Sequence, residues 1–183
     1  MKIFQTEDIR NVALIGAAKS GKTTLAENMV FEGKLINRKG TTEGKNTVSD
    51  YRPIETERGI SVNASLLYTI YNDKKINILD TPGFSDFSGD IVACLTAADM
   101  AVFTVNAQAG VEATTENAWK YATKTNKPVV FFMNQLDHSN ANFDDTVRQL
   151  KEYIGDKVTP VQFPVATGEG FNAVIDLITM KML

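Results

Sequence analysis

Short apolar runs alternate with stretches of helical periodicity along most of this chain. Continuous apolar runs are typical of strands that are buried on both faces, whereas apolar positions that recur once per helical turn are typical of helices packed on a sheet. The pattern predicts strands at residues 12–15, 64–71, 75–79, 100–105 and 128–133. It predicts helices at residues 24–31, 91–98, 111–123 and 142–153, and further apolar elements at 158–165 and 171–180.

The order of these elements predicts an α/β fold. The strands at 64–71 and 75–79 are joined by the turn Tyr71-Asn72-Asp73-Lys74, which predicts an antiparallel hairpin. Helices separate the other strands, which predicts parallel pairing with right-handed crossovers. We therefore expect a three-layer α/β/α architecture, a mostly parallel sheet with helices on both faces and ligands at the carboxyl ends of the strands.

One polar segment interrupts the alternation. Residues 33–47 are rich in Gly, Lys, Asn and Thr and offer no apolar face, so we expect a mobile surface segment. An idle linker would have this composition too. A long polar loop directly after a helix is more often a lid that responds to a ligand.

Composition limits the setting of the domain. The chain has 183 residues, 43% hydrophobic and 22% charged, which suits one globular domain with a sizeable core. A net charge of −3 gives no basic field, so we expect no direct binding of nucleic acid. Cys94 is the only cysteine, which agrees with a reducing compartment. Residues 1–11 show no signal peptide and no run approaches the ~20 apolar residues of a membrane span, so we expect a cytoplasmic monomer without a membrane partner.

Residues 16–23 carry the strongest chemical signal. They lie between the first predicted strand and helix, and they match G-x-x-x-x-G-K-[ST] as Gly16-Ala17-Ala18-Lys19-Ser20-Gly21-Lys22-Thr23. The glycines let the backbone curl so that successive N–H groups face an anion, and the helix N-terminus favours the same charge. Lys22 can reach the terminal phosphates of a nucleotide, and the Thr23 hydroxyl can ligate Mg²⁺.

Two further motifs begin where predicted strands end. Asp80-Thr81-Pro82-Gly83 offers an aspartate that can hold Mg²⁺ through water and a glycine whose N–H can approach a γ-phosphate. Asn134-Gln135-Leu136-Asp137 can recognise guanine, because a carboxylate accepts hydrogen bonds from N1–H and the 2-amino group, which adenine cannot supply. The phosphate loop alone leaves ATP and GTP open, and the later motif favours GTP. Ser61 offers a hydroxyl that can complete the Mg²⁺ shell when GTP is bound.

These stretches resemble the GTP-binding domain of elongation factor G, the translational GTPase that moves tRNA and mRNA through the ribosome. The resemblance covers essentially the whole chain and includes the three motifs above, residues 50–61 and residues 110–112. Release factor 3 and the ribosomal-protection tetracycline-resistance proteins share these patterns. Residues 115–119 and 170–177 favour the elongation factor.

The resemblance implies the P-loop NTPase fold of a translational GTPase domain. It also implies a GTPase that binds GTP or GDP with Mg²⁺ and acts on the ribosome. The nucleotide contacts that it implies are Ala17, Ala18, Lys19, Ser20, Gly21, Lys22, Thr23, Thr24, Asp80, Gly83, Asn134, Gln135 and Asp137. Thr23, Ser61 and Asp80 are the implied Mg²⁺ site. Lys22 and Gly83 are implied to act at the β- and γ-phosphates.

Four residues depart from the family pattern. Phe84 stands where the family usually has a histidine that positions the attacking water, so we expect slow hydrolysis with nucleotide binding intact. Lys19 replaces a frequent aspartate, and its ammonium is a candidate catalytic group near the β–γ bridge, although a solvent-facing lysine is the simpler interpretation. Ser61 replaces threonine and keeps the hydroxyl. Gln135 replaces lysine in the guanine motif, which costs packing on the base more than specificity.

The remaining expectations concern the extent of the domain and its activity. We expect residues 1–183 to be one GTP-binding domain of a larger factor, ending near the inserted subdomain of the family, with part of the base pocket outside this chain. Two hypotheses stay open: a switch that hydrolyses GTP on the ribosome, or a module that holds GTP with little or no hydrolysis, which Phe84 favours. Asp137 and the switch patterns disfavour an ATP-binding enzyme. The sequence leaves translocation, recycling and ribosome protection open.

Overall fold

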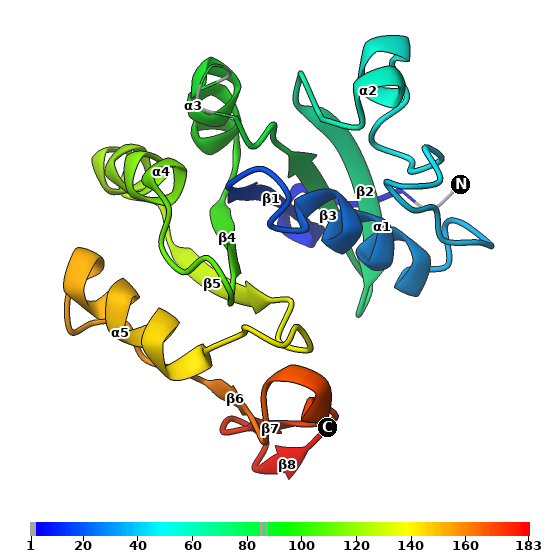
Figure 1. The fold of residues 1–183 in the computed structure, drawn as a ribbon. Helices are drawn as coiled ribbons and strands as arrows, with labels where there is room; N and C mark the ends of the chain where they lie inside the picture. The colour runs from blue at the N-terminus through cyan, green and yellow to red at the C-terminus, as the bar shows by residue number, and fades with distance from the viewer. Residues whose placement is uncertain (1–2, 85, 87) are drawn as a thin grey trace.

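A five-stranded sheet forms the centre of the molecule (Figure 1), in a computed structural model that describes residues 3–84, 86 and 88–183. Its strands are β1 (Ile9–Gly16), β2 (Ser65–Tyr71), β3 (Lys74–Asp80), β4 (Met100–Asn106) and β5 (Val129–Asn134). They lie in the order β2-β3-β1-β4-β5, and all pairs are parallel except β2 with β3. The predicted mostly parallel sheet is confirmed.

The helices lie close to the predicted positions. They are α1 (Lys22–Glu32), α2 (Pro53–Arg58), α3 (Ser88–Ala97), α4 (Ala113–Lys124) and α5 (Phe143–Ile154), with short 3-10 turns at Thr6–Asp8 and Gly168–Gly170. The apolar pattern did not predict α2. This short helix has a proline in its first turn and ends at Gly59, whose φ of 64° is the left-handed conformation that glycine adopts at low cost.

Alternate residues of β1 face two separate cores. Val12 and Leu14 pack with Ala26, Val30 and Ile78 under α1. Ala13 and Ile15 point to the opposite face, where they join a cluster from α3, α4 and β4: Ile91, Cys94, Leu95, Ala98, Ala101, Phe103, Ala118 and Ala122. Because both faces of the central strand are covered, the three-layer architecture that the sequence predicts is confirmed (Figure 1).

The hairpin between β2 and β3 turns at Asn72 and Asp73. Both residues have positive φ angles, 46° and 61°, which is the geometry of a two-residue type I′ turn. The turn fixes the antiparallel register in which Tyr71 opposes Lys74 and Ser65 opposes Asp80. The hairpin thereby delivers Asp80 to the carboxyl edge of the sheet.

The chain after α5 does not extend the parallel sheet. It forms a separate three-stranded antiparallel sheet of β6 (Gln162–Pro164), β7 (Val174–Asp176) and β8 (Lys181–Met182). The predicted strand at 158–165 is therefore only three residues long, and the predicted element at 171–180 divides into β7 and a turn. Asp176 accepts hydrogen bonds from the N–H groups of Ile178 and Thr179, which reverses the chain and favours antiparallel pairing without a crossover.

The polar segment at 33–47 lies against α1. The sequence predicts a surface segment here, but its last residue, Thr47, is buried, with only 7% of its surface exposed. Lys39 donates a hydrogen bond to Asn28 of α1, and its ammonium lies 5.2 Å from the centre of the Phe31 ring. Ile36 packs against the core under α1, and the polar and cation–π contacts with the helix add to this packing. An apolar pattern could not reveal the polar contacts.

Candidate functional site

The loop between β1 and α1 is held by the side chain of Lys22. Its ammonium donates hydrogen bonds to the carbonyl oxygens of Gly16 (2.9 Å) and Ala17 (2.8 Å). Lys22 is 6% exposed, and this burial lowers its pKa from 10.5 to about 8, although the negative charges of Asp80 and Glu112 oppose the shift. The loop therefore closes around a buried cation at the start of α1.

Two left-handed residues shape the backbone of this loop. Lys19 has a φ of 62° and Gly21 a φ of 94°. A side chain at Gly21 would overlap the Asn134 amide, so glycine is required there by both conformation and space. Such turns direct successive N–H groups toward one point, which is the arrangement that binds an anion.

Gly83 approaches the same loop from β3. A Cβ on Gly83 would lie 2.6 Å from the Ala18 nitrogen and 2.7 Å from the Lys22 ammonium nitrogen. No side chain fits at that position without moving the phosphate loop. The close approach places the backbone of Gly83 beside the predicted phosphate-binding groups, as the sequence motif predicts.

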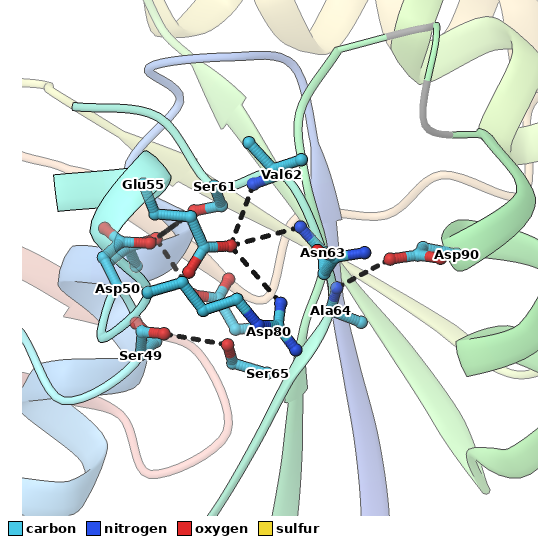
Figure 2. A network of polar contacts seen from close by, with 12 residues as sticks. Ser49, Asp50, Glu55, Ser61, Val62, Asn63, Ala64, Ser65, Asp80 and Asp90 are labelled. Atoms are coloured by element: carbon cyan, nitrogen blue, oxygen red, sulfur yellow. Dashed lines mark hydrogen bonds and ion pairs between the residues drawn. The ribbon is translucent and has the colours of Figure 1, made fainter. Parts of the chain in front are cut away.

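The three residues expected to bind Mg²⁺ come together. The Thr23 hydroxyl donates to Asp80 Oδ2 at 2.9 Å, and the hydroxyls of Thr23 and Ser61 lie 3.4 Å apart. Ser61 donates its own hydrogen to Asp50 Oδ1 at 2.8 Å, which leaves its oxygen lone pairs available to a cation (Figure 2). Asp80 Oδ1 is buried and has no hydrogen-bond partner among the described residues.

This donor set fits Mg²⁺ better than it fits a transition metal. All the donors are hard oxygens, and the unpartnered Asp80 oxygen has the electrostatic character of a cation site. The described part of the chain holds no group of three or more His, Cys, Asp or Glu side chains that could bind a metal by themselves. A Mg²⁺ ion here would complete its shell with phosphate oxygens and water, which is its common habit in nucleotide sites.

Carboxylates also fix the chain that follows Ser61. Glu55, 1% exposed, accepts hydrogen bonds from the N–H groups of Val62 (3.0 Å) and Asn63 (3.2 Å) through one oxygen, and Asp90 accepts from the N–H of Ala64 at 2.7 Å (Figure 2). The side chain of Ser65 adds a bond to the Ser49 carbonyl at 2.8 Å. The chain is thus anchored directly after Ser61.

The guanine motif is joined to the phosphate loop. Asn134 Nδ2 donates to the Ser20 carbonyl at 2.9 Å, and Gln135 Nε2 donates to the Lys19 carbonyl at 3.0 Å. Gln135 also accepts a hydrogen bond from Gln108 at 3.1 Å. Asp137 is exposed to solvent in the turn after β5.

One cavity of about 600 Å³ lies over these elements. Its lining residues are Ala18, Lys19, Gly21, Lys22, Thr23, Thr24, Thr42, Glu43, Lys45, Asp50, Gly59, Ile60, Ser61, Gly83, Phe84 and Gln135. Three predicted site residues, Ala17, Ser20 and Asp80, are buried beneath the wall, and Asn134 and Asp137 lie outside the lining. The lining also includes residues that sequence reasoning did not assign to the site: Thr42, Glu43, Lys45, Asp50, Gly59 and Ile60. The only signal for the first three was the expectation that residues 33–47 form a lid.

The comparison with protein families decides what kind of domain this is. Residues 7–182 match the family model described as the elongation factor Tu GTP binding domain. The chain belongs to this family. The resemblance to a translational GTP-binding domain that the sequence predicts is therefore confirmed.

The relatives of this elongation-factor GTP-binding domain are bacterial. Over 175 residues, 96% of the chain, it is 36% identical to an elongation factor G-like protein of Thermotoga maritima and 34% identical to elongation factor G of Mycoplasma genitalium. A crystal structure from Thermus thermophilus superposes on 95% of the chain with a TM-score of 0.89 and 32% identity. The chain spans 25% of both curated relatives and 26% of that solved chain. In the part of this domain that the structure describes, no helix has the length and apolar character needed to cross a bilayer.

The buried carboxyl of Asp80 predicts a change of stability with pH. Burial raises its pKa from 3.8 to about 6, against the hydrogen bond from Thr23 and the charge of Lys22. The folded state therefore favours the neutral form, and the penalty for the charged form grows as pH rises from about 4 to above 6.

Asp80→Asn should stabilise the chain by about 3 kcal/mol at pH 8 without Mg²⁺ and nucleotide, since each pKa unit corresponds to about 1.4 kcal/mol. Urea unfolding in a chelating buffer measures this, and the gain should largely disappear at pH 4. Asp156→Asn, at an exposed turn, is the matched control and should show no such gain. Equal or lower stability of Asp80→Asn at pH 8 would contradict the account.

Proposed function

We propose that this chain is the GTP-binding switch domain of a translation factor similar to elongation factor G. It binds GTP and GDP with Mg²⁺ and hydrolyses GTP on the ribosome during translocation. Residues 1–183 form one monomeric domain of a larger cytoplasmic factor, and the ribosome is contacted through the full-length protein. The observation that supports this is the convergence of Lys22, Thr23, Ser61 and Gly83 on one cavity above Asp80, in a chain of this family.

The binding roles follow from position. The N–H groups of residues 17–24 surround the α- and β-phosphates, while the Lys22 ammonium bridges the β- and γ-phosphates. Thr23, Ser61 and Asp80 would hold Mg²⁺, and the ion would supply charge stabilisation at the phosphates. Asn134 and Asp137 bind guanine, and Gln135 supports the phosphate loop through its bond to the Lys19 carbonyl.

Hydrolysis depends on groups near the γ-phosphate. Gly83 offers its N–H there, and Lys19 lines the cavity where its ammonium can stabilise charge at the β–γ bridge. Phe84 also lines the cavity and is 39% exposed, but its ring neither donates nor accepts a conventional hydrogen bond. Hydrolysis is therefore slow, because no side chain at this position orients the water.

Phe84 is also the observation that favours a second candidate. In this version the domain holds GTP as a structural signal and hydrolyses it little or not at all. The factor then resembles the elongation factor in binding but not in turnover. Release factor 3 and ribosomal-protection proteins are further models for the parent factor, since they share the switch patterns.

Base selection provides the first test. Titration of the chain with fluorescent GDP and ADP in the presence of Mg²⁺ should show GDP binding without ADP binding. Asp137→Ala should weaken GDP binding by about a hundredfold, because two hydrogen bonds to a charged acceptor are lost at about 1.5 kcal/mol each. Asp156→Ala changes an exposed turn aspartate and serves as the control. Equal affinity for GDP and ADP would argue against a working guanine site, and preference for ADP would overturn the assignment.

A second test separates the two candidates. Phe84→His in the full-length factor should increase ribosome-stimulated GTP hydrolysis, because the imidazole can orient the attacking water. Multiple-turnover phosphate release with ribosomes measures this. GDP affinity should stay unchanged, and Phe84→Leu controls for loss of the ring. An unchanged rate for Phe84→His would mean that other groups position the water.

A third test addresses Lys19. Lys19→Ala should slow GTP hydrolysis by more than tenfold if its ammonium stabilises the transition state as an arginine finger does. Single-turnover hydrolysis at saturating nucleotide separates this effect from weaker binding. Lys19→Arg keeps the charge and should retain most of the rate. If Lys19→Ala hydrolyses GTP as fast as the unchanged protein, Lys19 is a solvent-facing lysine without a catalytic role.

A further inference from the structure

A compact turn at residues 41–46 forms one wall of the cavity. The Thr41 hydroxyl accepts a hydrogen bond from the Gly44 N–H at 2.9 Å. The Thr41 N–H donates to Asn46 Oδ1, also at 2.9 Å. The Lys45 N–H closes the turn on the Thr42 carbonyl at 3.2 Å. The shape of this turn is therefore set by its own side chains.

The carboxylate of Glu27 clamps both ends of the turn to α1. One oxygen accepts the Gly40 N–H at 2.6 Å, and the other accepts the Val48 N–H at 2.8 Å. Glu27 is 2% exposed, so its charge has little contact with water. A buried carboxylate with one amide on each oxygen places residues 40 and 48 at fixed points on α1, and the turn spans the interval between them.

The turn brings Lys45 into the lining of the cavity that the phosphate loop also lines. Its ammonium donates to the Glu57 carbonyl at 3.3 Å, close to Gly59 and Ser61, which line the same cavity. Lys45 has a φ of 53°, a left-handed conformation that an ordinary residue adopts at a cost.

The charges of the cavity wall favour a ligand with more phosphate. Lys19, Lys22 and Lys45 contribute three positive charges, while Glu43 and Asp50 contribute negative charge. Asp50 already accepts a hydrogen bond from Ser61. The Lys22 ammonium is held by the carbonyls of the phosphate loop, whereas the Lys45 ammonium is held by the Glu57 carbonyl in a different segment. We therefore expect a chain of phosphates that begins at the loop to meet Lys45 only at its outer end.

We propose that Lys45 is a specificity-determining residue that contacts the terminal phosphate of a nucleoside triphosphate, and that Glu27 is the residue that positions it. This inference rests on the proposed function of the same cavity. A diphosphate ends before this wall, so it gains little from Lys45. The turn thereby favours the triphosphate state over the diphosphate state.

The test compares two lysines with the same backbone conformation. Lys45→Asn removes the charge at a residue type that tolerates left-handed φ, and Lys34→Asn does the same at an exposed position with a φ of 58° outside the cavity. Dissociation constants for GDP and for a non-hydrolysable GTP analogue are measured with Mg²⁺ on the full chain. Lys45→Asn should weaken the triphosphate about tenfold and GDP less than twofold, and Lys34→Asn should change neither.

Glu27→Gln tests the clamp, because an amide accepts from only one of the two N–H groups. It should lower the preference for triphosphate as Lys45→Asn does, and it should add little in the double variant if it acts through Lys45. A separate effect in the double variant would overturn the positioning role. A loss of GDP and triphosphate affinity to the same extent in Lys45→Asn, or no loss, would overturn the specificity role. Failure of the unchanged chain to bind any guanine nucleotide would instead overturn the proposed function.

Discussion

Lys22 and Asp80 bring opposite charges to the buried carboxyl edge of the sheet, where burial destabilises the charged form of each side chain. Burial lowers the pKa of Lys22 to about 8 and raises that of Asp80 to about 6, so each charged form is costly in the free protein. One Asp80 oxygen has no hydrogen-bond partner among the described residues. The site is thus electrostatically incomplete, and a phosphate with a cation would satisfy both groups at once. The strands and helices around it serve to hold these two groups in place.

A second theme is the use of carboxylates to hold polar backbone. Glu27, Glu55 and Asp90 each accept N–H groups from the chain between α1 and β2. In an ordinary loop these amides would be solvated. Here the three carboxylates add fixed hydrogen bonds to the few apolar contacts of this chain, which Ile36 and Ala64 make with the cores. Order of this kind can be exchanged for other hydrogen bonds at low cost, which suits segments that respond to a ligand.

The core of the fold and the motifs could be predicted because each rests on local sequence. The continuous apolar run from Val12 to Ile15 specifies a strand buried on both faces, and the glycines at 16 and 21 specify the loop. The clamp by Glu27 could not be predicted. Glu27 binds the backbone amides of Gly40 and Val48, and any sequence provides such amides. Lys45 was missed for a similar reason: a lysine in a polar loop has the pattern of a solvated side chain. The separate sheet β6-β7-β8 was missed because strands of two or three residues carry almost no periodic signal.

The amides of Asn134 and Gln135 connect the end of β5 to the carbonyls of Ser20 and Lys19. The proposed base-binding and phosphate-binding segments are therefore joined by hydrogen bonds and do not form two separate pockets. Recognition of the purine ring and grip on the phosphates then share a single mechanical frame. A poorly fitting base would disturb these hydrogen bonds and with them the geometry of the phosphate loop. The wrong nucleotide would then be held poorly at the phosphates, where hydrolysis takes place.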